Sequence, residues 1–316
     1  MQDDGGGRRE SGNNELDGGP GGADELFGDL GNDTYVLGSG NDTLLELVNS
    51  GIDTITSTIS RNIAGLANVE NILLLGTANI SATDNRSANT LSGNSGNNLL
   101  QGAGGDDLLN AGGGVDSLRG GLGSDTYVLG GENGVVSDTG GIDTITSPVY
   151  RNLLLETGYL TIENLTLTGT DNIEGVGNSL NNTLVYNSGN NVLNASAGRD
   201  VLTGNGGADQ FQFGFRSESS NTNPDVITDF NSAQADKIDL SLMASHDFND
   251  PISFIGTANF VGDNNTCQVR YQAATNGGFS GTEIRINRDQ GPGAVGDSHI
   301  LLRGVTSIAE ADFILF

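Results

Sequence analysis

A side chain able to donate oxygen ligands recurs every nine residues between Asp84 and Val128. The stretch divides without remainder into the nonapeptides DNRSANTLS, GNSGNNLLQ, GAGGDDLLN, AGGGVDSLR and GGLGSDTYV. Their sixth positions hold Asn89, Asn98, Asp107, Asp116 and Asp125, and their eighth positions hold Leu91, Leu100, Leu109, Leu118 and Tyr127. The last three blocks follow the pattern GGxGxDxUx, in which U is a large apolar residue. Oxygen ligands and apolar residues therefore recur in one register.

The chemistry that this pattern favours is calcium binding. The glycines allow positive φ, so the backbone can fold tightly with its carbonyl oxygens turned to one side. The sixth-position Asp adds a carboxylate to that group of carbonyls. Because Ca²⁺ takes six to eight oxygen ligands of both kinds, one loop supplies only part of a site. The pattern therefore predicts that loops bind calcium in pairs.

The elements that must position these loops are short strands around each eighth-position residue. Side chains alternate along a strand, so this apolar residue points one way and its polar neighbours the other. If two nonapeptides make one turn of a flattened coil, loops on the same edge stack about 4.8 Å apart. Asp107 and Asp125 would then share one ion, whereas Asp116 would face Asn98 and have one carboxylate fewer. The apolar column becomes a thin core that bound calcium reinforces.

Two further arrays repeat the pattern. One comprises GPGGADELF from Gly19, GDLGNDTYV from Gly28 and LGSGNDTLL from Leu37. The other comprises GNSLNNTLV from Gly177, YNSGNNVLN from Tyr186, ASAGRDVLT from Ala195 and GNGGADQFQ from Gly204. Over the three arrays, the predicted ligands of several calcium ions are Asp24, Gly28, Gly31, Asp33, Gly40, Asp42, Gly102, Gly105, Asp107, Gly112, Gly114, Asp116, Gly120, Gly121, Gly123, Asp125, Gly198, Asp200, Gly204, Gly207 and Asp209.

The two later arrays begin with Asn at the sixth position and end with Asp. Asn keeps a carbonyl ligand but lacks the charge, so turns bearing Asn89, Asn98, Asn182 or Asn191 are expected to bind calcium weakly or not at all. We interpret them as structural. Asp53 and Asp143 each occur in Gly-Ile-Asp-Thr-Ile and could be isolated ligands, but we favour a plain turn there.

The composition agrees with a repeat protein. Only 5% of the residues are aromatic, Trp is absent and Gly numbers 50, which is poor material for a conventional core but suits stacked repeats. Forty acidic residues against thirteen basic ones give a net charge of −27, which argues against a nucleic-acid or anionic-membrane partner. Acidity alone would also serve solubility. Without a cation the clustered carboxylates should repel, leaving the repeats disordered.

The cysteine content and the lack of targeting segments bear on where the protein is located. Cys267 is the only cysteine, so no internal disulfide can form. The opening residues MQDDG lack the basic and apolar regions of a cleaved signal peptide. No stretch approaches the roughly 18 apolar residues of a transmembrane helix. We therefore expect a soluble protein or a fragment of a longer one.

A module of about 92 residues is duplicated. Residues 34–46 resemble 126–138, 51–57 recur as 141–147, and 69–72 as 162–165. We predict a disordered or degenerate lead-in (1–17), a first module (18–125), a second module (126–215) and a C-terminal cap (216–316). The spacers alternate in places and are expected to continue the coil without calcium turns. The cap contains four predicted strands, Val226–Phe230, Lys237–Leu240, Gln268–Tyr271 and Glu283–Ile286.

These residues resemble a known family. The nonapeptides resemble the RTX, or hemolysin-type, calcium-binding repeats of bacterial secreted proteins. GADQFQF, DVITDF, ADKIDLS and the closing LRGVTSIAEADFILF resemble the C-terminal region of serralysin metalloproteases and related type I secreted proteins. IENLTLTGTDN is similar to a phrase found between RTX blocks in many bacterial calcium-binding proteins.

The resemblance implies an all-β fold: a right-handed parallel β-roll, or β-solenoid, with a β-sandwich-like cap. Such proteins leave the cell unfolded through a type I exporter, which reads an uncleaved C-terminal signal, and fold on extracellular calcium. The end from Asp312 to Phe316 resembles that signal, with an apolar run one residue longer than usual; it could also be a final strand of the cap. We expect a secreted monomer, either free outside the cell or associated with the cell surface.

No catalytic motif accompanies the repeats. Serralysins carry the zinc motif HExxH, but neither His246 nor His299 has a Glu in that spacing, and we interpret both as surface or loop residues. A lipase-type GxSxG is absent, and Cys267 has no nearby His to make it a nucleophile. We therefore predict a non-enzymatic secretion and folding module. The alternatives are the C-terminal part of a secreted metalloprotease, lipase or alginate epimerase, with its catalytic domain upstream of Met1, or a surface adhesin or matrix protein using Thr54, Thr56 and Thr58.

Overall fold

The computed structural model describes residues 11–132, 134–214, 218–220, 223–243, 252–260, 267–276, 279–288 and 298–315. They form two compact units, residues 11–146 and residues 147–315, which we take separately. Strands dominate both units. The helical elements are α1 (Ser241–Met243), η1 (Tyr159–Thr161), η2 (Ser232–Gln234) and η4 (Glu310–Asp312).

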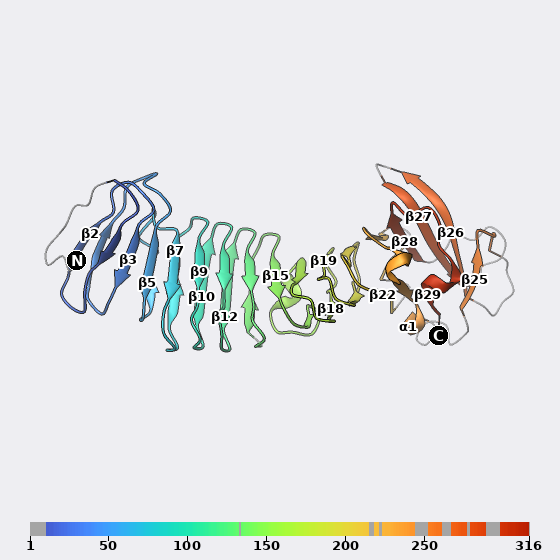
Figure 1. The fold of residues 1–316 in the computed structure, drawn as a ribbon, viewed down its shortest axis with the longest axis horizontal. Helices are drawn as coiled ribbons and strands as arrows, with labels where there is room; N and C mark the ends of the chain where they lie inside the picture. The colour runs from blue at the N-terminus through green and yellow to red at the C-terminus, as the bar shows by residue number, and fades with distance from the viewer. Residues whose placement is uncertain are drawn as a thin grey trace. The chain divides into compact units, whose positions relative to one another are not determined.

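The first unit is a coil of short parallel strands arranged in sheets (Figure 1). One long sheet contains, in spatial order, β1 (Glu15–Asp17), β3 (Thr34–Leu37), β5 (Thr54–Ser57), β7 (Asn71–Leu74), β9 (Thr90–Ser92), β11 (Leu108–Asn110), β13 (Thr126–Val128) and β15 (Thr144–Ser147). The even-numbered strands are the pair β2 (Glu25–Phe27) and β4 (Thr43–Leu45), and the sheet β6 (Arg61–Asn62), β8 (Ser81–Thr83), β10 (Leu99–Gly104), β12 (Ser117–Leu122) and β14 (Val135–Ser137).

The register confirms the predicted coil of two nonapeptides per turn. Leu109 in β11 pairs with Tyr127 in β13, and Leu100 in β10 pairs with Leu118 in β12, each pair two blocks apart. All of these side chains are fully buried. Burying one such side chain contributes roughly 1.5–3 kcal/mol, but most strands place only one or two of them inside, so the core stays thin.

The coil extends beyond the nonapeptide arrays in both directions. Leu16 in β1 pairs with Tyr35, so part of the predicted lead-in forms a strand. In the first spacer Ile72 pairs with both Ile55 and Leu91, which confirms that this spacer continues the coil. Past the predicted domain boundary at 125/126, β14 and β15 continue the coil to the end of the first unit.

The second unit has two sheets. One is ordered β17 (Asn164–Leu167), β19 (Thr183–Val185), β21 (Val201–Thr203), β23 (Asp225–Ile227), β28 (Ser298–Arg303), β27 (Phe279–Arg288), β26 (Cys267–Asn276) and β25 (Ile252–Gly256). The other is ordered β16 (Arg151–Asn152), β18 (Glu174–Val176), β20 (Val192–Asn194), β22 (Gln210–Gln212), β24 (Lys237–Asp239) and β29 (Phe313–Ile314). The array that begins at Gly177 therefore leads into the C-terminal strands without a change of sheet.

The C-terminal strands form the predicted sandwich-like cap by extending both sheets of the coil. In the first sheet β28 pairs parallel to β23, and β27 pairs antiparallel to both β26 and β28. The rings of Phe254 and Phe313, from opposite sheets, lie 5.3 Å apart. All four strands predicted from the sequence are present, as β23, β24, β26 and β27. The predicted start of the cap at residue 216 lies outside the described residues.

Candidate calcium sites

The sixth-position residue of each block lies at the end of a turn, directly before the strand that carries the apolar eighth position. Asp107 precedes β11 and Asp125 precedes β13. Because these strands stack in parallel, their preceding turns stack too, and the acceptors form rows. We call the edge whose turns lead into odd-numbered strands the first edge, and the edge whose turns lead into even-numbered strands the second edge.

Backbone-to-carboxylate hydrogen bonds join the first-edge row. The N–H of Asn89 donates to Oδ1 of Asp107 (2.9 Å), and the N–H of Asp107 donates to Oδ1 of Asp125 (2.8 Å). The N–H of Asp125 donates in turn to Oδ1 of Asp143 (2.8 Å). Each carboxylate is thus held by the turn before it, and Asp107 and Asp125 are neighbours as the spacing predicts.

The second edge follows the same rule. The N–H of Asn98 donates to Oδ1 of Asp116 (2.7 Å), which places Asp116 against an amide rather than a carboxylate, as predicted. Near the N-terminus the N–H of Asp24 donates to Oδ1 of Asp42 (3.3 Å). In the second unit the same bonds link Asn182, Asp200 and Asp225 on the first edge, and Asn191, Asp209 and Asp236 on the second edge.

One oxygen of most predicted Asp ligands is buried without a hydrogen-bond partner among the described residues. Oδ1 accepts the backbone N–H, and Oδ2 faces the interior of the turn. These Oδ2 atoms belong to Asp33, Asp42, Asp107, Asp125, Asp200 and Asp209. A buried carboxylate oxygen without a donor is costly unless a cation binds it, so these turns fit a calcium ion.

The predicted glycines shape the space around those oxygens. A Cβ on Gly120 would collide with Oδ2 of Asp125 and with the hydroxyl of Tyr127. Gly123 has φ +122°, and a Cβ there would collide with the carbonyl oxygen of Gly105 in the neighbouring turn. Gly120 therefore keeps the oxygen-lined space open, and Gly123 is required both for its backbone conformation and for the close approach of the neighbouring turn.

Burial makes the charges in these rows costly. It raises the pKa of Asp107 to about 8, with nearby Asp84 and Asp125 adding to the rise. Burial likewise raises the pKa of Asp125 to about 6 and that of Asp209 to about 6. A protonated carboxyl or a bound cation would each relieve this cost, and at neutral pH the cation leaves the carboxylates ionised.

Two family models match the chain. The RTX calcium-binding nonapeptide repeat (4 copies) matches residues 10–44. The Peptidase M10 serralysin C terminal model matches residues 35–315, which is most of the chain. The chain belongs to the serralysin C-terminal family. A search of curated proteins finds no match. RTX repeats bind calcium, and together with this C-terminal region they are typical of secreted, extracellular proteins.

This serralysin C-terminal chain has further acceptors that the nonapeptide search missed. Asp225 and Asp236 extend the two rows of the second unit and are buried. Asp53 and Asp143 are also buried members of the first-edge row, which corrects the plain-turn interpretation. These residues could have been found in the sequence by a pattern shorter than the nonapeptide. Each Asp lies two residues before an apolar residue, and that apolar residue pairs with the eighth-position residue of a nonapeptide.

The Asn-bearing turns of this family member are satisfied by their own amides. In the block from Gly93, Nδ2 of Asn94 donates to the carbonyls of Leu75 and Ala78 (3.1 Å each), while its Oδ1 accepts the N–H of Gly96 (2.7 Å). The same set of bonds, with Nδ2 donating to two carbonyls of the previous turn and Oδ1 accepting the N–H two residues later, is made by Asn85, Asn178 and Asn187. An amide nitrogen therefore binds carbonyls of the neighbouring turn, as expected of a structural turn.

The remaining candidate residues have other places. His299 lies buried in β28 with Nδ1 2.7 Å from Oε1 of Glu283, so its interpretation as a surface or loop residue was wrong. Three hydrogen-bonding neighbours (His299, Arg285 and Gln272) outweigh burial and lower the pKa of Glu283 to about 2. Cys267 is a buried thiol at the start of β26. His246 lies outside the described residues.

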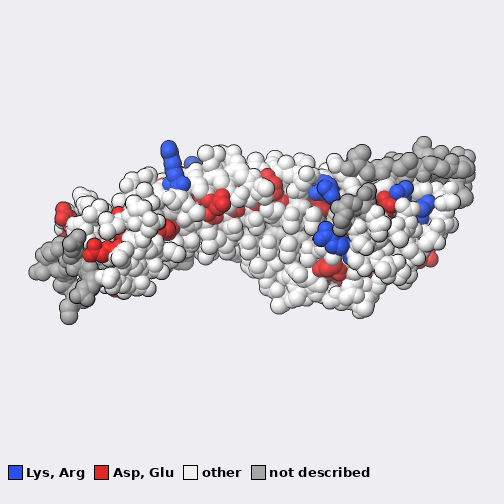
Figure 2. Space-filling model, turned by 90° about the horizontal axis from the view of Figure 1, so that it is seen from above, with Lys and Arg blue, Asp and Glu red and all other residues white. Residues whose placement is uncertain are grey.

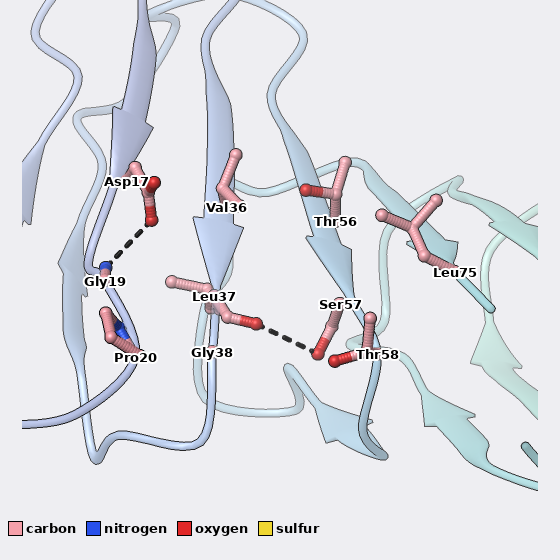
Figure 3. Close-up of a pocket in the computed structure, with 10 residues that line it drawn as sticks. All are labelled: Asp17, Gly19, Pro20, Val36, Leu37, Gly38, Thr56, Ser57, Thr58 and Leu75. Atoms are coloured by element: carbon pink, nitrogen blue, oxygen red, sulfur yellow. Dashed lines mark hydrogen bonds between the residues drawn. The ribbon is translucent and has the colours of Figure 1, made fainter. Parts of the chain in front are cut away.

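Two of the three threonines suggested for an adhesin, Thr56 and Thr58, line a hollow of the first unit. This shallow hollow of about 240 Å³ is lined partly by Thr56, Ser57 and Thr58 (Figure 3). Its other walls include Val36, Leu37 and Leu75, and no aromatic ring lines it for a sugar to stack on. Figure 2 shows acidic side chains in small groups rather than in one patch, because many of the acids are buried in the rows.

The RTX repeat and the β-solenoid fold are non-catalytic, and the serralysin C-terminal region belongs to protease-associated proteins. None of its helices has the length and apolarity to cross a membrane.

Proposed function

We propose that this chain is the calcium-dependent folding and secretion module of a protein exported by a type I system. The observation that carries the proposal is the pair of acceptor rows, in which buried Oδ2 atoms lack donors in the described chain. We assign the calcium ligands to the sixth-position Asp residues predicted from the sequence and to the glycine turns before them. We expect the number of bound calcium ions to increase with the number of stacked Asp turns.

The energetics favour a switch between two states. In the absence of calcium the folded rows place several carboxylates close together and out of water, which opposes folding. When calcium binds only the folded form, folding is stabilised by mass action. Calcium is scarce in the bacterial cytosol and abundant outside, so the chain stays unfolded during export and folds after it.

The C-terminus supports this order of events. Phe313 and Leu315 are 8% and 6% exposed, and β29 pairs with β24. An exporter that reads these apolar residues needs them accessible, and they are accessible only before β29 docks. The final strand and the export signal are therefore compatible functions of one segment, used at different times. Phe316 lies outside the described residues.

The test is far-UV circular dichroism during a calcium titration that starts in chelator, with magnesium as the control ion. In chelator we expect a partly folded chain that gains most of its β-structure when calcium binds and not when magnesium is added, because Mg²⁺ demands a smaller octahedral site and dehydrates reluctantly. A spectrum that is already fully β-rich in chelator would contradict the switch and leave calcium as an accessory on a preformed scaffold.

A second candidate is suggested by the family match, because the family is defined as the C-terminal region of a peptidase. In that case the module would serve a secreted metalloprotease. Sequencing the gene upstream of residue 1 decides between them: an HExxH motif in the same reading frame would support the enzyme, and a stop codon directly upstream would exclude it.

A further inference from the structure

Two groups of three carboxylates occur in the described part of the first unit. The first carboxylate cluster is Asp33, Glu46 and Asp53, and the second carboxylate cluster is Asp125, Asp138 and Asp143. Corresponding members lie 90 or 92 residues apart, so the module duplication has placed the same cluster twice. Two members of each cluster belong to the first-edge row. The third, Glu46 or Asp138, lies outside the sixth-position pattern.

We propose that each carboxylate cluster is a cation site of a second type, in which this extra acid gives three carboxylates where a nonapeptide turn gives one or two. The ligand is a hard, oxygen-seeking cation, Ca²⁺ in the extracellular medium. The inference rests on the proposed calcium-binding function but adds ligands, Glu46 and Asp138, that the repeat pattern does not contain.

The spacing of the oxygens suits a single ion. In each cluster, one oxygen from each carboxylate lies within 4.8 Å of the other two. Calcium–oxygen distances are about 2.3–2.6 Å, so two ligands on opposite sides of one ion are about 5 Å apart at most. Three carboxylates this close would repel one another strongly without a cation between them.

Unpartnered buried oxygens are directed into both clusters. Asp33 and Asp125 are each 1% exposed, and Oδ2 of each has no hydrogen-bond partner in the described ranges. The same holds for Oδ2 of Asp138, whose Oδ1 is fixed by the N–H of Thr139 (2.7 Å). No described Lys or Arg forms an ion pair with these three residues. The positive charge that these three carboxylates require is therefore not supplied by ion pairs within the described ranges.

The third acid reaches the cluster in two different ways. In the block DTGGIDTIT, Asp138 occupies the first position, where most of the nonapeptides carry Gly and one carries Asp84. In the first module the turn between Asp33 and Asp53 is two residues longer, and the acid is Glu46, whose side chain is longer by one methylene. Oε2 of Glu46 accepts from Ser50 Oγ (2.8 Å), which holds the carboxylate toward the row. The acid is kept although the turn differs.

A tyrosine hydroxyl borders each cluster. The hydroxyl of Tyr35 donates to Oε1 of Glu46, and a Cβ on Gly28 would collide with both atoms and with Oδ2 of Asp33. In the second cluster the hydroxyl of Tyr127 lies beside Oδ2 of Asp125 in the same way, against Gly120. A lanthanide bound in either cluster would therefore lie near a phenol ring.

The experiment titrates the calcium-free full chain with Tb³⁺ and records terbium emission excited through tyrosine. Tb³⁺ takes oxygen ligands as Ca²⁺ does. We expect the double variant Glu46→Gln with Asp138→Asn to raise the Tb³⁺ concentration at half-maximal emission about tenfold, because ligand charge tunes affinity. Asp106→Asn is the control: Asp106 is exposed and accepts the N–H of Ser124, so this variant removes one carboxylate charge outside the clusters, against two in the double variant.

A double variant that titrates like the wild type, or an equal shift in the Asp106→Asn control, would overturn the inference. If the double variant does not fold, Tyr35→Phe with Tyr127→Phe replaces it. Loss of most of the sensitised emission, with Tb³⁺ still bound by calorimetry, then supports the clusters, and unchanged emission overturns them. Circular dichroism of the wild type with calcium tests the proposed function independently, so failure of one is distinguishable from failure of the other.

Discussion

The Asn turns and the Asp turns of this chain follow the same nonapeptide repeat, but they differ in how their buried polar groups are hydrogen-bonded. We call the blocks from residues 84, 93, 177 and 186 the Asn turns, and those from 102, 111, 120, 195 and 204 the Asp turns. In the Asn turns, amide N–H groups donate to carbonyls of the neighbouring turn. In most of the Asp turns the sixth position presents a buried oxygen that finds no donor among the described residues.

The difference teaches how calcium dependence is distributed along the coil. Each of the two later arrays starts with turns that are satisfied by their own Asn amides and ends with turns whose Asp carboxylates we propose as calcium ligands. The Asn turns can stack without charge repulsion, whereas the Asp turns gain their full stability only when an ion is bound. Folding of each array can therefore begin at its Asn turns and extend into its Asp turns as calcium becomes available.

The largest expected effect comes from removing the charge of one Asp array. Substituting Asp107, Asp116 and Asp125 by Ala together should abolish the calcium-driven gain of β-structure in this array, because no sixth-position carboxylate remains in it. The measurement is circular dichroism during a calcium titration, with hydrogen exchange to locate the change. Asp106→Ala is the control. A triple variant with an unchanged calcium response would show that these turns do not hold the ions.

Hydrogen exchange in chelator should separate the two kinds of turn directly. We expect amides in residues 84–101 to exchange at least about tenfold more slowly than those in residues 102–119, which corresponds to about 1.4 kcal/mol of opening free energy. The reason is that the Asn amides hold the first stretch together without an ion. Adding calcium should remove most of the difference. Equal exchange in chelator would contradict the division into two kinds of turn.

Converting one Asn turn toward an Asp turn should make it calcium-dependent. Asn94→Asp removes the amide that donates to the carbonyls of Leu75 and Ala78, so in chelator it should cost about 1–3 kcal/mol of unfolding free energy. Calcium should restore part of this loss. Thermal unfolding with and without calcium measures it. Asn97→Asp is the matched control, because Asn97 is exposed and uses only its oxygen, to accept the N–H of Val115.

The sequence predicted the coil well because acceptor and apolar residues recur every nine residues, and this period sets the register of the strands. The pairing of Leu109 with Tyr127 and the adjacency of Asp107 and Asp125 follow from counting alone. The sequence could not reveal the role of residues that lie outside this nine-residue repeat. Asp225 and Asp236 join the rows after turns of irregular length, so only the tertiary fold brings them into place.

Long-range contacts explain the other differences. His299 reads as an isolated polar residue in sequence, but β28 pairs with β27 and buries it against Glu283. Glu46 lies next to Asp33 only because one turn of coil closes between them. Asn94 stands at the second position of its block, where the repeat pattern has Gly. Its amide donates to carbonyls of the previous turn, which the sequence does not show. In each case the partner is more than ten residues away.

The smallest expected effect is on pH dependence, and its sign distinguishes the Asp turns from the Asn turns, which do not titrate. Burial raises the pKa of Asp107 and of Asp225 to about 8, and that of Asp200 to about 7, against an ordinary value of about 3.9 in the unfolded chain. Between about pH 4 and pH 8 the calcium-free fold therefore binds more protons than the unfolded chain. Its unfolding free energy must then fall as pH rises through that range.

With calcium bound the trend should reverse, because the ligands must lose their protons to bind the ion, and acid competes with it. Melting temperatures in chelator should thus rise from pH 8 to pH 5.5, while those in saturating calcium should fall. Asp107→Asn should flatten both slopes, since the amide carries no proton to gain or lose. Parallel slopes in chelator and calcium would mean that the titrating groups are not the ones that hold the ion, and the Asp turns would lose their distinction from the Asn turns.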